Sequence, residues 1–196
     1  SVAELFSRLT EEDRDRQCAI LEASFQMIDA SSHGIDRIGT VGPGAAGGVV
    51  QSPREKVIEI ACLIERMAVM HHDPDGGASA AWIAPSLHVE SDTWGLDTLP
   101  VELMHGQGGV ALFLAAVSAL DDQSARWSGL ARSALQRIVH DVEAGRCPAV
   151  RGEWQGAFEG GPSAAAALLL VGERIDDTVL REAGWSLLRQ TSPNQL

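Results

Sequence analysis

The stretch Leu103-Met104-His105-Gly106-Gln107-Gly108-Gly109 opens a run of small and apolar residues, and Gly156-Ala157-Phe158-Glu159-Gly160-Gly161-Pro162 opens a second run of the same kind. When Gly106 is aligned with Gly160, the chain repeats after about 54 residues (160 − 106). Such a repeat is typical of stacked helical hairpins, each of which needs a neighbour to bury its apolar face. These two stretches therefore predict an all-α fold class.

Each repeat unit predicts a nearly all-apolar helix followed by a helix with one apolar face. The apolar helices run over 112–120 and 164–171, and the acidic pairs Asp121-Asp122 and Asp176-Asp177 lead from each of them into an amphipathic helix. An apolar helix is buried all round, whereas a one-faced helix keeps a wet side, so we expect an inner and an outer layer. Four glycines are interpreted as structural, because backbone must pass close to another element where an inner helix begins. They are Gly106, Gly109, Gly156 and Gly160.

The chain upstream of the repeat predicts two more helices and a short hairpin. A helix is expected over 11–29, followed by a Gly-rich connection over 31–51. Ser52-Pro53-Arg54-Glu55 combines a capping box with proline at the first helical position, and it begins the second helix. Residues 82–97 predict a short β-hairpin or structured loop, too small to form a large sheet.

Composition and charge exclude several classes of protein. The chain has 196 residues, of which 45% are hydrophobic, and 15 Lys+Arg against 27 Asp+Glu give a net charge of −12. This charge argues against nucleic acid and against anionic lipid as partners. The longest apolar run, 110–120, is shorter than the roughly 18 to 20 residues that span a bilayer, and no secretion signal opens the chain. We therefore expect a cytoplasmic protein.

Side chains that could bind a metal are scattered along the sequence. Cys18, Cys62 and Cys147 form no Cys-x-x-Cys pair, so they predict neither a disulfide framework nor a zinc site. Cys18 and Cys62 are expected to be half-buried helix residues. His71-His72-Asp73 and Asp75 are interpreted as a solvated helix end, because adjacent side chains diverge there.

Two further patterns are interpreted as structural. Gly42-Pro43-Gly44-Ala45-Ala46-Gly47 matches G-x-G-x-x-G, but no strand precedes it and no capped helix follows, so we interpret it as a linker rather than a dinucleotide site. His140-Asp141, near the end of an amphipathic helix, is expected at the surface.

Glu102 and His105 are the catalytic candidates, because they stand immediately before an inner helix. The amino end of that helix could orient a substrate, and a polar side chain there could face a central cavity. The alternative is structural: both residues cap and solvate the loop. Glu159 has the matching place in the second unit and the same two interpretations. No Ser-His-Asp or Cys-His arrangement can be assembled from the sequence.

Four segments, taken in order, carry a resemblance to a known family: 9–20, Trp82-Ile83-Ala84 with Trp94-Gly95-Leu96, 103–115 and 156–163. They resemble the cyclase region of class II lanthipeptide synthetases, the LanM type, whose cyclase domain is LanC-like. The first is similar to the segment that joins dehydratase to cyclase, and the second to the tryptophan-bearing stretch before the first toroid helix. The last two are similar to the family's first and second glycine motifs. The resemblance covers most of the chain.

The resemblance implies a fold and a reaction. The fold is an (α/α) toroid, a ring of inner helices wrapped by outer ones, so this chain would be a partial (α/α) toroid of helical hairpins. In the complete cyclase domain, zinc deprotonates a precursor-peptide Cys, whose thiolate adds to dehydroalanine or dehydrobutyrine to form a thioether ring. A dehydratase domain would first dehydrate Ser and Thr with ATP and Mg. The implied partners are the precursor (leader–core) peptide and the remainder of the synthetase.

The resemblance also implies a division of the chain. Residues 1–51 would be a leading helix and Gly-rich connection from the dehydratase side, and residues 52–196 would be the first part of the LanC-like barrel. The family's zinc ligands, two Cys and one His, and its acid/base Asp and His belong to later repeats, so we expect them beyond Leu196. This segment would supply scaffold and cavity wall, with no catalytic, metal-binding or cofactor-binding residue. His105 stands where the family usually has Asp.

Two alternatives stay open at this stage. The chain could be a complete but degenerate helical-toroid module that binds a peptide or protein partner without catalysis. It could also belong to another (α/α) toroid enzyme, such as a glycosidase with paired carboxylates. A glycosidase would need acidic side chains on the inner helices, and these helices carry almost none.

Overall fold

The computed structural model describes residues 52–72, 77–88, 93–146 and 160–190, together with the isolated residues 11, 14, 17, 18, 21, 156 and 158. The chain divides into two compact units. One comprises Ser1–Val50 and Ile83–Thr98, and the other comprises Gln51–Trp82 and Leu99–Leu196. Each unit is described by itself.

The described part of the first unit is an antiparallel β-hairpin. Strand β3, Ile83–His88, pairs with β4, Thr93–Thr98, in a register that places Leu87 opposite Trp94. This confirms the hairpin predicted near residues 82–97. Of the helix predicted over 11–29, the few described residues are helical, while the rest of it and the 31–51 connection lie outside the described residues.

The second unit begins with helix α3, Pro53–Met67, as the capping box predicts. The Ser52 Oγ accepts a hydrogen bond from the Glu55 N–H at 3.2 Å, and the Glu55 carboxylate accepts one from the Ser52 N–H at 2.8 Å. Together these bonds satisfy two backbone donors that have no partner within the helix. Among the apolar residues of α3, Ala61 is fully buried, whereas Ile60 and Met67 are exposed.

A β-hairpin that the sequence did not predict follows α3, so the fold has more β-structure than the one hairpin expected in an otherwise all-α chain. Strand β1, Val69–His72, pairs antiparallel with β2, Ala78–Ala81. The helix ends because Ala68 takes an extended conformation, with φ −67° and ψ 130°. His71 and His72 are exposed as predicted, but they lie in a strand and not at a helix end. Asp73 and Asp75 lie outside the described residues. The protein is thus mostly helical, with two small antiparallel sheets.

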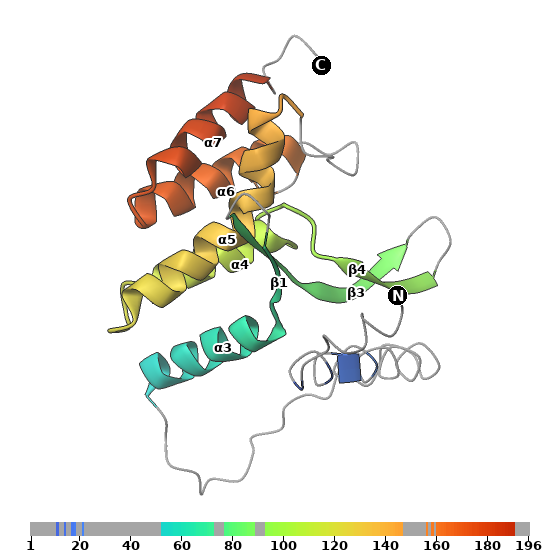
Figure 1. The fold of residues 1–196 in the computed structure, drawn as a ribbon, viewed down its shortest axis with the longest axis vertical. Coiled ribbons are helices and arrows are strands. Elements are labelled where there is room, and N and C mark those ends of the chain that lie inside the picture. The colour runs from blue at the N-terminus through green and yellow to red at the C-terminus, as the bar shows by residue number, and fades with distance from the viewer. Residues whose placement is uncertain are drawn as a thin grey trace, which may run out of the picture. The chain divides into compact units, whose positions relative to one another are not determined.

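The two predicted helical hairpins are present in the second unit (Figure 1). The first consists of α4, Gln107–Val117, and α5, Ser124–Glu143; the second consists of α6, Gly160–Arg174, and α7, Thr178–Gln190. No residue of α4 is exposed and only Leu170, Glu173 and Arg174 of α6 are, whereas α5 and α7 each have one buried side and one exposed side. This confirms the predicted difference between the first and second helix of each unit.

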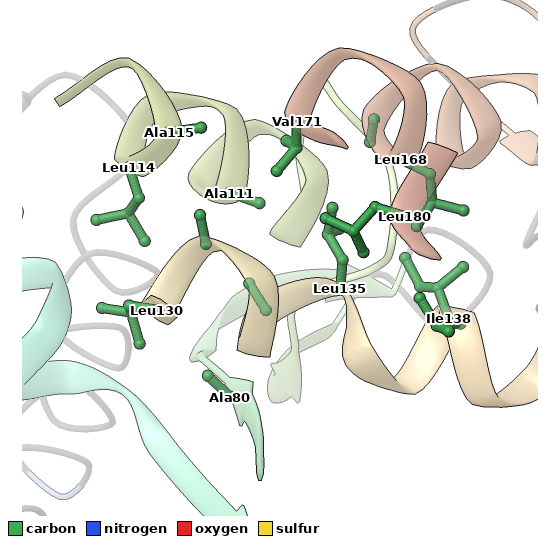
Figure 2. Packing of buried hydrophobic residues seen from close by; sticks show 14 of the residues in the cluster. Ala80, Ala111, Leu114, Ala115, Leu130, Leu135, Ile138, Leu168, Val171 and Leu180 are labelled. Carbon is green, nitrogen blue, oxygen red and sulfur yellow. The ribbon is translucent and has the colours of Figure 1, made fainter. Parts of the chain in front are cut away.

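The hairpins stack in register, with α4 against α6 and α5 against α7. Figure 2 shows Ala111 and Ala115 of α4 facing Val171 of α6, and Leu135 of α5 close to Leu180 of α7. Strand β2 packs on α5, and α3 contacts α4. The core of the unit is therefore a two-layer helical stack with a small hairpin against its outer layer. None of its described helices is long and apolar enough to cross a bilayer.

Candidate functional site

The amino ends of α4 and α6 meet at one place, which we call the glycine-motif junction and define as residues 99–109, 158 and 160–163. Two hydrogen bonds cross it. The Glu102 carboxylate accepts from the Gly160 N–H at 3.1 Å, and the Leu103 N–H donates to the Ser163 Oγ at 2.8 Å. The Ser163 side chain is fully buried, so this bond satisfies a hydroxyl that has no access to water. The segment before α4 therefore caps the first turn of α6.

A relay of hydrogen bonds continues from the junction to α3. Gln107 donates its backbone N–H to the Pro100 carbonyl at 2.7 Å and its side-chain amide to the Leu99 carbonyl at 3.1 Å. The Leu99 N–H donates to the Trp82 carbonyl at 2.8 Å, and the Trp82 indole donates to the carbonyl of Ile64 in α3 at 2.8 Å. The junction is thus connected through backbone groups to the start of the unit.

Two of the four motif glycines allow the close approach that the sequence predicts. A Cβ on Gly106 would collide with the Pro100 carbonyl oxygen, and one on Gly109 would collide with the Leu103 carbonyl oxygen. Gly160 has φ +80°, a conformation that side chains rarely adopt. At Gly156 a Cβ would meet nothing within 4 Å, so close approach does not explain that glycine.

The two catalytic candidates differ in their surroundings. The carboxylate of Glu102 is partly buried and caps α6, which supports its structural interpretation. His105 is exposed at the amino end of α4. Beside it, the exposed side chains of Met104 and Phe158 occupy the same place in the two repeats, and the Met104 N–H donates to the Phe158 carbonyl at 3.3 Å. Glu159 lies outside the described residues.

The opposite ends of the inner helices hold a second polar cluster, centred on Asp177. Its carboxylate accepts from the Leu180 N–H at 3.1 Å, which caps α7, and it pairs with Arg132 of α5 at 3.2 Å. The preceding residue, Asp176, has φ +53° and accepts a hydrogen bond from Arg181 at 3.1 Å. Asp177 therefore joins the two hairpins at this end, as Glu102 does at the other.

A third cluster ties α3 to the start of α5. Arg126 forms a two-pronged ion pair with Glu65, and its guanidinium lies 4.4 Å from the centre of the Trp127 ring. The hydrogen bond from Arg126 lowers the pKa of Glu65 below its ordinary value. The Trp127 indole donates to the Asp121 carboxylate at 2.6 Å, and this bond lowers the pKa of Asp121.

The cysteines and histidines that the sequence analysis considered as metal ligands are not grouped in the described part of the chain. Among the described residues, no three His, Cys, Asp or Glu side chains are grouped so that they could hold a metal ion. Cys62 is half-buried on α3 as predicted, whereas Cys18 is exposed, which corrects its predicted half-burial. His140 is exposed near the end of α5, as expected, and Asp141 pairs with Arg146 at 2.8 Å. Cys147 and the 42–47 glycine stretch lie outside the described residues.

Sequence reasoning missed two residues that join the hairpins, Ser163 and Asp177. Ser163 reads as one more small residue in an apolar run, although a lone hydroxyl there is a signal that a backbone donor needs a partner. Asp177 follows an acidic neighbour and precedes a helix, which is an N-cap signal, but its pairing with Arg132 has no local signature.

The contacts at the glycine-motif junction and around Asp177 hold the two helical hairpins together. The carboxylates of Glu102 and Asp177 cap helices, Asp177 also pairs with an arginine, and the buried Ser163 hydroxyl accepts a backbone N–H. Comparison with protein-family models and with curated proteins gives no match for this chain.

Proposed function

We propose that this chain is the first part of the LanC-like cyclase domain of a class II lanthipeptide synthetase. The whole cytoplasmic enzyme would dehydrate Ser and Thr of a precursor peptide and close (methyl)lanthionine rings. The observation that supports this proposal is the stacking of two glycine-motif hairpins, α4 on α6 and α5 on α7, with the more completely buried helix first in each. An (α/α) toroid is built from hairpins of this kind, in which an inner helix is followed by an outer helix.

In this proposal the segment supplies scaffold and cavity wall. Glu102 holds the two inner helices together by capping α6, and it performs no proton transfer. His105, Met104 and Phe158 line the amino ends of the inner helices, where a precursor peptide would pass.

The described residues do not fit the zinc site that the family resemblance implies. Among them, no three metal-binding side chains are grouped so that they could hold an ion. Zinc, like ATP and Mg, is therefore assigned to parts of the synthetase outside the described residues. No chemical step is assigned to this segment.

The proposal is tested with the complete gene product that contains this chain. We would co-express it with a candidate precursor peptide that contains Ser, Thr and Cys, and then treat the peptide with N-ethylmaleimide. The expected mass spectrum shows the loss of one water per modified Ser or Thr and no alkylation of the ring-forming Cys. A precursor that stays fully hydrated and fully alkylated would contradict the proposal. Peptide binding without modification would instead favour the degenerate, non-catalytic module.

A further inference from the structure

The solvent side of α3 carries a stripe of large apolar side chains. Ile60, Leu63 and Met67 are 41%, 48% and 51% exposed. Their spacing of i, i+3 and i+7 places them within about 60° of one another around the helix axis. Ala61, the buried residue of the same helix, lies roughly 100° to 160° away from them. We call these three exposed residues the α3 stripe.

The two edges of the α3 stripe differ in chemistry. Along one edge, Glu59 and Arg66 are exposed, and because they are seven residues apart they lie on the same side of the stripe, about two turns from each other. Along the other edge, Val57 and Ile64 pack partly buried against the core. The edge that faces solvent therefore carries one negative and one positive charge.

This pattern is complementary to itself when two copies of α3 pair antiparallel around a twofold axis. Ile60 of each copy then lies opposite Leu63 of the other copy, as in an antiparallel coiled coil. The same arrangement brings Glu59 of each copy next to Arg66 of the other, so that two ion pairs flank the apolar contact. In a parallel pair Glu59 would instead approach Ile64, and opposite charges would not meet.

We infer that the α3 stripe is a self-association surface, on which a second copy of this chain binds with its own α3 antiparallel. Grouped apolar side chains that solvent reaches are typical of an interaction site. Three half-exposed side chains per copy bury less than the roughly 800 Å² per partner of a standard interface, so we expect a weak dimer, with a dissociation constant of about 10 to 100 μM. This inference goes beyond the proposed function and does not rest on it.

The test is sedimentation velocity of the complete gene product, over protein concentrations from about 1 to 200 μM, which bracket this constant. The sedimentation coefficient is expected to rise with concentration, as in a monomer–dimer equilibrium. Leu63→Glu should abolish the rise, because it places a charge without a partner against Ile60 of the other copy. Leu170, which is 49% exposed on α6, provides the matched control, and Leu170→Glu should leave the rise unchanged. A monomer at every concentration, or equal loss in the two variants, would overturn the inference.

Charge reversal tests the orientation of the two copies. Glu59→Arg and Arg66→Glu each place like charges opposite one another in a homodimer, so each variant alone should associate several-fold more weakly than wild type. In an equimolar mixture of the two variants, opposite charges meet again on both flanks, and association should rise several-fold above that of either variant alone. Glu59 also pairs with Lys56 of its own helix at 2.9 Å, but mixing does not restore that pair, so recovery reports on the contact between copies. A mixture that associates no better than its separate components would overturn the inference.

Discussion

The carboxylate of Glu102 accepts a hydrogen bond from the backbone N–H of Gly160, 58 residues away and 3.1 Å distant. The acceptor belongs to the segment before α4, and the donor is the first residue of α6. A negative charge at this end of α6 also interacts favourably with the helix dipole. The Glu102 carboxylate thus links the segment before α4 to the first turn of α6.

Replacing Glu102 by Ala is expected to lower the free energy of unfolding by about 1 kcal/mol, the usual cost of a lost helix cap. Glu102→Gln keeps a side-chain oxygen that can accept the same hydrogen bond, so its loss should be smaller. Urea unfolding followed by circular dichroism measures both. Equal stability of wild type and Glu102→Ala would contradict the capping role.

How far the sequence predicts this fold depends on how local each signal is. Two signals are local. The capping box at Ser52 correctly predicts α3, and the change at Asp121 from an all-apolar segment to one with a single apolar face correctly predicts α4 and α5. The β1–β2 hairpin was missed because apolar residues follow a helical spacing as far as Ala68. The helix ends there because the backbone of Ala68 becomes extended. At the junction, the glycines indicated close approach, but the partners of Ser163 and Glu102 come from the other repeat and have no local pattern.

Gly108 and Gly129 give a matched pair of glycine-to-alanine changes with opposite expected signs. A Cβ on Gly108 would lie 2.9 Å from the Cβ of Ala167 in α6, so Gly108→Ala forces the inner helices apart and should cost about 1 to 3 kcal/mol. A Cβ on Gly129, within α5, would meet nothing within 4 Å. Gly129→Ala should therefore stabilise the protein by about 0.5 to 1 kcal/mol through helix propensity. Thermal unfolding of both variants checks the signs, and destabilisation by both would show that α5 does not tolerate the change.

Asp177 combines a helix cap with an ion pair, and two substitutions separate the two roles. Asp177→Asn keeps a good capping oxygen but loses the charge that faces Arg132, so only the modest ion-pair contribution, below about 1 kcal/mol, should be lost. Asp177→Ala removes both and should cost about 1 to 2 kcal/mol. In Arg132→Ala, the Asp177→Asn change should have a smaller effect than in wild type. Urea unfolding of the single and double variants measures this coupling, and full additivity would mean that the ion pair contributes nothing.

The ion pair between Glu65 and Arg126 makes part of the stability dependent on pH. Because Arg126 lowers the pKa of Glu65 below its ordinary value of 4.5, the folded state favours the ionised carboxylate. The stabilisation is complete above the unfolded pKa and is lost as the pH falls below about 4.5 through the folded pKa. Glu65→Gln should therefore be less stable than wild type at neutral pH, by about 1 kcal/mol or less since the pair is about one-third exposed.

The measurement is urea unfolding of wild type and Glu65→Gln at a series of pH values, with Lys56→Gln as the control. The difference in unfolding free energy between wild type and Glu65→Gln should stay constant above about pH 5 and shrink toward zero at acidic pH. Lys56 pairs with Glu59 on the same helix, but both side chains are more than half exposed, so Lys56→Gln should change stability by less than about 0.5 kcal/mol. A Glu65→Gln difference that does not vary with pH would mean that its carboxylate has the same pKa in the folded and unfolded chains.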